Sequence, residues 1–309
     1  MSNNTITVVK PGPLTLLQDF GRFGVAHMGL AQGGPVDDYA YSWANHLLGN
    51  SVNSPVLEIT LGQAAFRINS DCQLSITGGD LNAKLDGEPL INWATFSAYK
   101  GQILSFSLPK NGLRSYLAVK GGFKVPMQVG SCATVTKDKL GGLENGRPIT
   151  EGDTIAFASH HIDHKSVQLT FRYKPDYNLP LKLRVIESYQ HHMFGQESLN
   201  QFYNCKFRIS QHSNRMGYRL EGAAITAPEK AILSEGIALG AIQVPPNGEP
   251  IILLNDRQTI GGYPKIGCVA RIDLPRLAQA KPGQQVTFVE GDLAGLQDVW
   301  CQWANFFGY

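Results

Sequence analysis

The sequence predicts a mainly β protein whose antiparallel strands close, or nearly close, into barrels. Thirty-three glycines and seventeen prolines divide the 309 residues into many short runs. Within these runs apolar residues alternate: Leu104, Phe106 and Leu108 share one face, and every second position of 179–185 is apolar. The stretches DGEP, PKNG, PPNG and AKPGQQ between such runs are typical of turns.

Two segments have a helical period instead. After Pro35, Asp37 can cap a helix that ends at Gly49-Asn50. Its apolar stripe comprises Ala40, Trp43, Ala44, Leu47 and Leu48. A second stripe near the C-terminus comprises Leu293, Leu296, Trp300, Trp303 and Phe307, and we expect it to pack within the chain.

The composition changes at ASHHIDHKSVQ, residues 158–168, between two sets of predicted strands. We therefore predict an N-terminal β-barrel-like domain over 1–160 and a C-terminal one over 161–309 that carries the terminal helix. A chain of this length buries enough surface to be stable without disulfides.

Charge and targeting signals exclude several classes of protein. The 27 basic and 25 acidic residues form no long run of one sign, so neither nucleic acid nor a membrane surface is indicated as a partner. The N-terminal MSNNTITVVKPGP lacks the apolar centre of a signal peptide, and no apolar run is long enough to span a bilayer. The sequence therefore predicts a cytoplasmic protein. Its five scattered cysteines favour small buried side chains over disulfides or a zinc site.

The common cofactor motifs are missing from the sequence. His160, His161, Asp163 and His164 are metal-ligating types, but their spacing matches no standard site, and we interpret them as a solvated loop. No glycine pair belongs to a GxxxxGK[ST] phosphate loop, and there is no GxSxG elbow. No lysine is flanked by methionines as in a biotin attachment site. We predict no metal and no biotin attachment site.

Polar residues gather in 251–267, IILLNDRQTIGGYPKIG, where a buried strand ends. SNRMGYRLEG (213–222), the stretch 233–250 and LLQDFGRFGVAHMGLAQGGPVDD (16–38) are similarly polar. Arg215 and Arg219 could offer forked donors to a carboxylate or phosphate. Glu235, Gln243 and Asp256 could orient or deprotonate an amide or a water. For any one of these side chains, closing a hydrogen bond at a strand end is an equally good interpretation.

Several motifs in the same order resemble the family that includes the C subunit of 5-oxoprolinase (KipA) and the carboxyltransferase region of urea carboxylase, also called allophanate hydrolase subunit 2. The resemblance runs from about Val8 to about Glu290. It rests on VVKPGPLTLLQDFGRFG, ANHLLGN, LEITLGQ, ITGGDLNAKLDG, LRSYLAVKGGFKVPMQVGSCAT, SNRMGYRLEG and DRQTIGGYPKIG.

The resemblance implies two cyclophilin-like β-barrel domains with a few short helices, which agrees with the strand-rich pattern. It also implies the 5-oxoprolinase subunits B and A as partners, in a complex that opens 5-oxoproline to glutamate at the expense of ATP. ATP would then be used by the complex, with its site on this chain or on a partner. The chain would be one component of a lactam hydrolase, active only in the complex.

Phosphorylating the oxygen of a lactam with ATP needs cations for developing charge and a carboxylate or amide to hold the ring N–H. Under this hypothesis the catalytic residues are Asp256, Lys265 and Glu235. The substrate-binding residues are Arg215, Arg219, Gln243, Arg257, Gln258, Thr259, Gly261, Gly262 and Tyr263. The two glycines would allow close approach of the backbone, and Tyr263-Pro264 would stiffen the exit from the turn.

Two other functions stay open from the sequence. A biotin-dependent carboxyltransferase component acting on urea or a similar amide needs nearly the same groups, because it too deprotonates an amide nitrogen. A non-catalytic regulatory protein of KipA type would bind a kinase inhibitor related to the B component without chemistry. The cluster of Asp256, Arg257 and Lys265 favours an enzyme over this third function.

Overall fold

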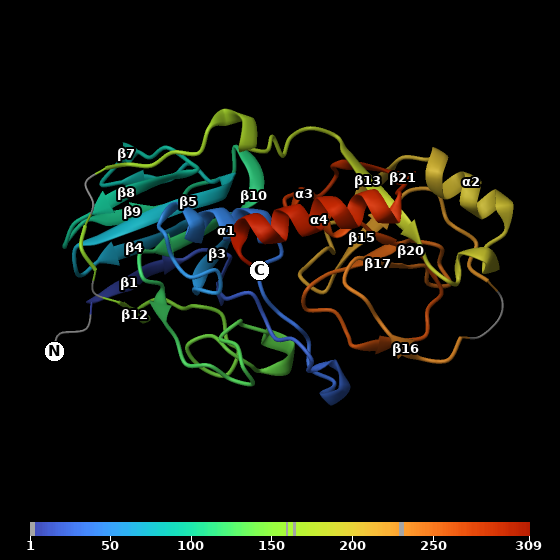
Figure 1. Cartoon of the computed structure of the whole chain (residues 1–309), viewed down its shortest axis with the longest axis horizontal. Coiled ribbons are helices and arrows are strands. Elements are labelled where there is room, and N and C mark those ends of the chain that lie inside the picture. The colour runs from blue at the N-terminus through green and yellow to red at the C-terminus, as the bar shows by residue number, and fades with distance from the viewer. Residues whose placement is uncertain (1–3, 159, 163–164, 229–231) are drawn as a thin grey trace. The chain divides into compact units, whose positions relative to one another are not determined.

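The computed structural model describes residues 4–158, 160–162, 165–228 and 232–309 (Figure 1). The chain forms two compact units. Unit 1 contains residues 1–22 and 33–178, and unit 2 contains residues 23–32 and 179–309. The predicted mainly β class is confirmed, because strands make up most of the regular structure of the described chain.

The described residues of unit 1 form two antiparallel sheets and one α-helix. The seven-stranded sheet has the order β11-β12-β1-β4-β9-β6-β7, and the five-stranded sheet the order β2-β3-β10-β5-β8. The strands are β1 (Asn4–Pro11), β2 (Leu14–Gln18), β3 (Val56–Thr60), β4 (Ala64–Ile68), β5 (Cys72–Asp80), β6 (Lys84–Leu85), β7 (Glu88–Pro89), β8 (Ala94–Ala98), β9 (Ile103–Ser105), β10 (Asn111–Val119), β11 (Phe123–Lys124) and β12 (Thr154–Phe157). Short 3-10 helices lie at Thr136–Asp138 and Phe171–Tyr173.

The two sheets of unit 1 share one core. Ile6 and Phe66 come from the larger sheet and Leu57 and Leu74 from the smaller, and all four side chains are buried in the same cluster. The DGEP turn joins β6 to β7, with Asp86 at φ 49° and Gly87 at φ 89°. Positive φ at both positions is typical of a two-residue hairpin loop.

The helix predicted after Pro35 is confirmed as α1 (Asp38–Leu47). The Asp37 carboxylate caps it by accepting a hydrogen bond from Ala40 N at 2.8 Å. Strand β5 holds the helix through its hydroxyls: Ser75 Oγ donates to Ala44 O and Thr77 Oγ1 to Ala40 O, both at 2.6 Å. These bonds and the buried apolar stripe fix α1 on the smaller sheet.

Cys72 lies in the core of unit 1, and burial raises its pKa to about 12. An unfolded chain ionises this thiol near its ordinary pKa of about 8.5, so the thiol contributes stability below that pH and loses it as pH rises toward 12. Urea unfolding under reducing conditions should therefore show a steeper alkaline loss for the wild type than for Cys72→Ala. The expected difference is about 1.4 kcal/mol per pH unit within this window. Parallel pH profiles would contradict it.

Unit 2 is a closed barrel with the strand order β13-β20-β17-β18-β15-β14-β21. Its strands are β13 (Leu181–Glu187), β14 (Phe207–Ile209), β15 (Gly217–Glu221), β17 (Ala241–Gln243), β18 (Ile251–Leu253), β20 (Lys265–Val269) and β21 (Gln285–Glu290). Closure comes from a parallel pairing of β13 with β21, and the other pairings are antiparallel. A separate two-stranded ribbon pairs β16 (Glu235–Gly236) with β19 (Ile260–Gly261).

Three α-helices accompany the barrel in the described part of unit 2: α2 (Gln196–Asn204), α3 (Leu274–Ala278) and α4 (Leu293–Phe307). Short 3-10 helices lie at Ala26–Met28, His191–Met193 and Arg271–Asp273. Phe202 of α2 stacks on Phe288 of β21 with ring centroids 4.3 Å apart. The predicted terminal helix is confirmed as α4, and the Arg271 guanidinium lies 3.8 Å from the centroid of the Trp300 ring. In the part of the chain that is described, no helix is long and apolar enough to cross a bilayer.

The two units divide between residues 178 and 179, whereas the sequence placed the domain limit between 160 and 161. Residues 165–178 belong to unit 1, because Thr95 N donates to Val167 O at 2.8 Å and Leu169 N donates to Trp93 O at 2.9 Å.

Two runs of alternating apolar residues extend beyond the strands that they predict. Leu108 is 65% exposed and Leu179 is 53% exposed, because β9 ends at Ser105 and β13 begins at Leu181.

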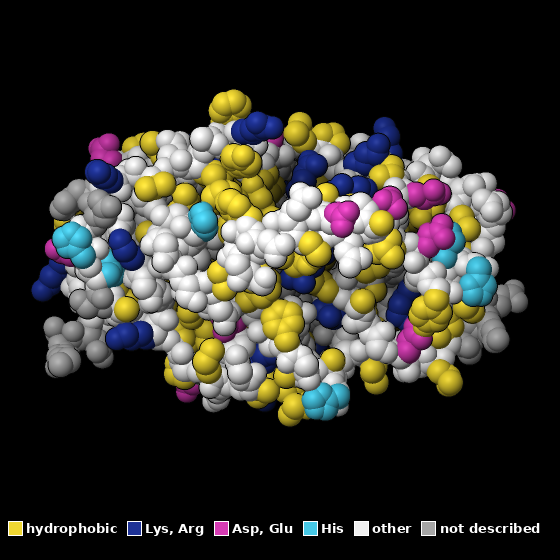
Figure 2. All heavy atoms as spheres, viewed as in Figure 1, with side chains coloured by type: hydrophobic (Ala, Val, Ile, Leu, Met, Phe, Trp, Pro, Cys, Tyr) yellow, Lys and Arg dark blue, Asp and Glu magenta, His cyan; other side chains and the backbone are white. Residues whose placement is uncertain are grey.

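Charged side chains are mixed on the face of the molecule shown in Figure 2. Basic and acidic groups lie scattered among hydrophobic and other side chains on this face. This mixture agrees with the nearly balanced charge of the sequence.

Candidate functional site

A carboxylate–ammonium pair joins the ribbon to the barrel in unit 2. Lys265 Nζ, at the start of β20, lies 2.5 Å from Glu235 Oε1 in β16. The Lys265 side chain is 6% exposed and that of Glu235 is 31% exposed, so the pair is screened by solvent on the Glu235 side only. The structure therefore brings together two of the three residues predicted to be catalytic.

Two residues that the sequence did not single out hold this pair in place. Gln190 is buried, and its Nε2 donates to Glu235 Oε1 at 2.8 Å while its Oε1 accepts from Lys265 N at 2.8 Å. The Tyr189 hydroxyl donates to Glu235 Oε2. Both residues come shortly after β13. A Tyr-Gln pair after a buried strand is the sequence signal that could have indicated them. Glu235 is thus held by a phenol, an amide and an ammonium.

Gln243 lies beside this pair at the end of β17, opposite Lys265 in the ladder. Its Nε2 is buried and has no hydrogen-bond partner among the described residues. The absence of a side chain at Gly261 matters here, because a Cβ would lie 2.8 Å from Ile237 Cδ1 and 3.0 Å from Gln243 Nε2. Gly261 therefore lets the ribbon approach the Gln243 amide closely.

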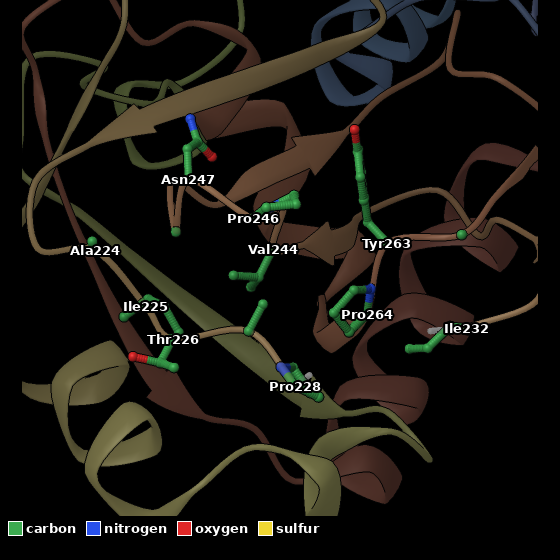
Figure 3. Close-up of a pocket in the computed structure, with 13 residues that line it drawn as sticks. Ala224, Ile225, Thr226, Pro228, Ile232, Val244, Pro246, Asn247, Tyr263 and Pro264 are labelled. Carbon is green, nitrogen blue, oxygen red and sulfur yellow. The ribbon is translucent and has the colours of Figure 1, made fainter. Parts of the chain in front are cut away.

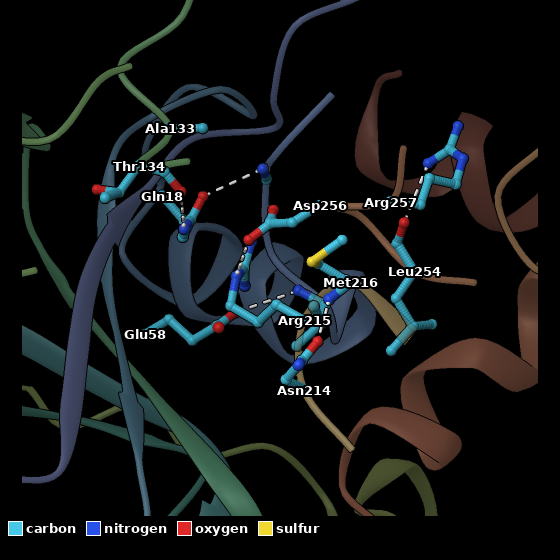
Figure 4. A network of polar contacts seen from close by, with 12 residues as sticks. Gln18, Glu58, Ala133, Thr134, Asn214, Arg215, Met216, Leu254, Asp256 and Arg257 are labelled. Atoms are coloured by element: carbon cyan, nitrogen blue, oxygen red, sulfur yellow. Dashed lines mark hydrogen bonds and ion pairs between the residues drawn. The ribbon is translucent and has the colours of Figure 1, made fainter. Parts of the chain in front are cut away.

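Asp256 and Arg215 form a second, separate ion pair (Figure 4). Arg215 Nε lies 2.9 Å from Asp256 Oδ2, and Arg215 Nη2 lies 3.0 Å from Asp256 Oδ1. The two side chains are 6% and 7% exposed. A two-point pair of this kind fixes the loop after β18 to the segment before β15, since Asp256 N also donates to Arg215 O at 3.0 Å. The geometry favours a structural role for Asp256 over that of a base.

Arg257 follows Asp256 in the sequence but turns away from the pair in Figure 4. Its Nε donates to Ile237 O at 3.0 Å and its Nη1 to Leu254 O at 3.2 Å. Desolvation lowers the pKa of its guanidinium, although the Cys268 thiol and the Asp256 carboxylate oppose this effect. Burial raises the pKa of the Cys268 thiol to about 11, which keeps it protonated at neutral pH.

The other residues that the sequence predicts to bind substrate differ in how exposed their side chains are. Arg219 is exposed on β15, while Gln258 and Thr259 are half-buried between Arg257 and the ribbon. Tyr263 is 45% exposed, and a Cβ at Gly262 would lie 3.0 Å from Ile232 O.

A cavity of about 530 Å³ opens at one end of the barrel (Figure 3). The loops 224–228, 244–248 and 262–264 contribute its walls, and Val244 and Ile225 are buried in the barrel core. Gly262, Tyr263 and Pro264 of the GGYP motif line it, but none of its described lining residues is charged. A pocket of this composition suits an uncharged, largely apolar group.

Unit 1 contains its own buried polar network, built from motifs that carried the family resemblance. Glu58 Oε2 accepts from the Tyr116 hydroxyl at 2.8 Å and from Val36 N at 3.1 Å, and Arg114 Nε lies 3.9 Å from Glu58 Oε1. Burial raises the pKa of Tyr116 well above its ordinary value.

Gln18 bridges two segments of the same unit. Its Nε2 donates to Thr134 O and its Oε1 accepts from Gly34 N, both at 3.1 Å (Figure 4). These bonds hold the loop that precedes α1. The sequence prediction named none of these unit 1 residues as a site, although LLQDFGRFG, LEITLGQ and LRSYL together pointed to them.

The histidine-rich stretch is partly described. His160 Nε2 accepts a hydrogen bond from Gln73 N at 3.0 Å, and its Nδ1 lies 3.0 Å from Ala158 O, so its ring is used within unit 1. Asp163 and His164 lie outside the described residues. Over the ranges that are described, no group of three or more His, Cys, Asp or Glu side chains is arranged to hold a metal ion.

Comparison with known proteins places these motifs in a family. The chain is 37% identical to the C subunit of 5-oxoprolinase from Escherichia coli, over 93% of its own length and 92% of that protein. The crystal structure of TTHA0988 matches with a TM-score of 0.85 and 30% identity over 93% of this chain. The crystal structure of Kluyveromyces lactis urea carboxylase matches with a TM-score of 0.88 and 26% identity over 99% of this chain. This chain spans only 56% of the former structure and 29% of the latter.

The model of the family described as carboxyltransferase domain, subdomain A and B, matches residues 28–290. This range contains the Glu235–Lys265 pair, the GGYP motif and most of the unit 1 network. The resemblance inferred from the sequence motifs is thereby confirmed. The chain belongs to the carboxyltransferase domain family, subdomain A and B.

Proposed function

We propose that this chain is the C subunit of an ATP-dependent 5-oxoprolinase, acting with subunits A and B to convert 5-oxoproline to glutamate. The observation that carries the proposal is the match to the corresponding 5-oxoprolinase component of Escherichia coli, which spans 93% of this chain and 92% of that protein. Activity only within the complex and coupling to ATP hydrolysis are parts of the same proposal.

The Glu235–Lys265 pair is the part of the chain best suited to lactam chemistry. A carboxylate can accept the proton of a ring N–H, and an ammonium can stabilise negative charge on the adjacent oxygen. Glu235 is held by Tyr189 and Gln190, so it meets a ligand in one orientation. Lys265 Nζ uses one of its three N–H groups on Glu235. In this proposal Glu235 binds the ring N–H and Lys265 faces the carbonyl oxygen.

Two cations of the predicted site are already paired and so give no support to an ATP site on this chain. A triphosphate needs several cations or a glycine-rich loop of free N–H groups. Arg215 and Lys265 are each engaged with a carboxylate, and the described lining of the cavity at the end of the barrel carries no charge. We therefore assign the ATP site to a partner of the complex.

A second candidate function is the carboxyltransferase component of a biotin-dependent enzyme acting on urea or a similar amide. The match to Kluyveromyces lactis urea carboxylase over 99% of this chain favours it. The uncharged cavity wall at the end of the barrel, as far as its residues are described, also suits a neutral ligand.

The experiment is to purify the chain with its A and B partners and to measure ATP hydrolysis that depends on 5-oxoproline. We expect activity in the full mixture and none with any one component left out. The control replaces 5-oxoproline with urea and biotin carboxylase components. Activity with urea, together with none on 5-oxoproline in the complete mixture, would replace the proposal with the second candidate.

A further inference from the structure

Arg257 differs from Arg215 and Lys265, the two buried cations of the predicted site, because no carboxylate forms an ion pair with it among the described residues. Arg215 is paired with Asp256 and Lys265 with Glu235, whereas the half-buried Arg257 forms no ion pair within the described ranges. Removing a guanidinium from water without a counter-charge is unfavourable. Such an arginine is therefore a candidate for receiving its counter-charge from a ligand.

The guanidinium of Arg257 is anchored in advance. The backbone N–H of Arg257 closes a turn on Leu254 O at 3.1 Å, and Nη1 donates to the same oxygen at 3.2 Å. Nε donates to Ile237 O at 3.0 Å, just beyond the ribbon that carries Glu235. Two donors are thus used to orient the group, and Nη2 has no hydrogen-bond partner among the described residues. A planar guanidinium held in this way loses little conformational freedom when it binds an anion.

The turn that carries Arg257 is itself fixed. Leu254 N donates to Met216 O at 2.9 Å and Asp256 N to Arg215 O at 3.0 Å, and the buried Arg215–Asp256 pair adds side-chain bonds to these. Asp256 forms its ion pair with Arg215, and no ion pair joins it to Arg257 among the described residues.

Two further polar groups follow Arg257 in the chain. The side chains of Gln258 and Thr259 are half-buried and make no hydrogen bond with other described residues. The Gln258 amide lies near the ribbon, since a Cβ built at Gly261 would be 3.7 Å from its Nε2, and both side chains keep donors that no other described residue uses.

The geometry points to Arg257 as the residue that binds the carboxylate of a small anionic substrate. This inference rests on the proposed function and makes it more specific. 5-Oxoproline carries a carboxylate besides its lactam, whereas urea is neutral. The Glu235–Lys265 pair is neutral in sum, so Arg257 is the cation that would distinguish the two. The structure thereby favours the lactam acid over urea.

The first test measures anion binding by the chain itself. The Tm is recorded with 5-oxoproline, with the neutral 5-oxoprolinamide, with inorganic phosphate and with sodium chloride at equal ionic strength. We expect 5-oxoproline alone to raise the Tm of the wild type and of Arg208→Gln, which alters an exposed arginine on β14, and to leave that of Arg257→Gln unchanged. A wild type that does not respond, an Arg257→Gln variant that responds like the wild type, or an equal response to phosphate would each overturn the assignment.

The second test uses the assembled complex. Arg257→Gln should raise the KM for 5-oxoproline by about tenfold to a hundredfold, the usual effect of losing a hydrogen-bonded charge, with a smaller change in kcat. Arg257→Lys should restore part of the loss, because it retains the charge without the fork. An active complex in which Arg257→Gln keeps the wild-type KM refutes the role of Arg257 and leaves the proposed function intact. A complex inactive on 5-oxoproline refutes the proposed function, and the Tm measurements then decide on Arg257 alone.

Discussion

Glu235→Gln is expected to lower the kcat of the assembled oxoprolinase by about a hundredfold or more, the usual contribution of a positioned acid or base. The substitution is nearly isosteric. The remaining oxygen can still accept from Lys265 Nζ and Gln190 Nε2, and the Tyr189 hydroxyl can turn to accept from the new amide. What is lost is the capacity to take a proton. Steady-state assays of 5-oxoproline-dependent ATP hydrolysis measure the effect.

The control for this prediction is Glu249→Gln. Glu249 is exposed in unit 2 and contacts only Asn247 through its side chain in the described part of the chain, so its substitution should leave kcat unchanged. The Tm of both variants should stay near that of the wild type, because neither change removes buried volume. If Glu235→Gln retains more than about a third of the wild-type kcat, Glu235 does not transfer a proton in the slow step.

Asp256→Ala is expected to lower the free energy of unfolding by about 3–5 kcal/mol, because it removes the carboxylate that forms a two-point ion pair with the buried Arg215 guanidinium. The double substitution Arg215→Met, Asp256→Leu should cost less than the single one, since it removes both charges together. Urea denaturation of the three proteins at one pH gives the comparison. A single substitution that costs less than the double one would show that the pair does not couple.

The matched control is the Arg184–Asp273 pair of the same unit. It has the same two-point geometry, with Arg184 Nε 2.9 Å from Asp273 Oδ2, but its arginine side chain is 42% exposed. Asp273→Ala leaves behind a guanidinium that solvent can reach, so it should cost less than Asp256→Ala. Equal losses for Asp256→Ala and Asp273→Ala would mean that burial of the remaining arginine does not determine the cost.

Much of the fold could be predicted from local patterns. Alternation of apolar residues identified the strands around Leu104 and Leu183, and the capping residue Asp37 identified the start of α1. Strand ends were less certain, since Leu108 and Leu179 continue the pattern by sequence but are exposed. Alternation describes which residues can share a face, and only the packed sheet determines where that face stops being covered.

Sequence by itself determined the family, because the order of seven motifs is specific, and it predicts a site at the polar residues of 251–267, which stays a prediction. The tertiary structure decided how these residues divide, since pairing depends on contacts between segments far apart in the chain. Asp256 pairs with Arg215 across 41 positions and Lys265 with Glu235 across 30, while Arg257 donates only to backbone carbonyls among the described residues. Tyr189 and Gln190 join the pair because β13 lies beside β20 in the barrel. Residue types therefore indicate the chemistry, and strand order determines which of them can act together.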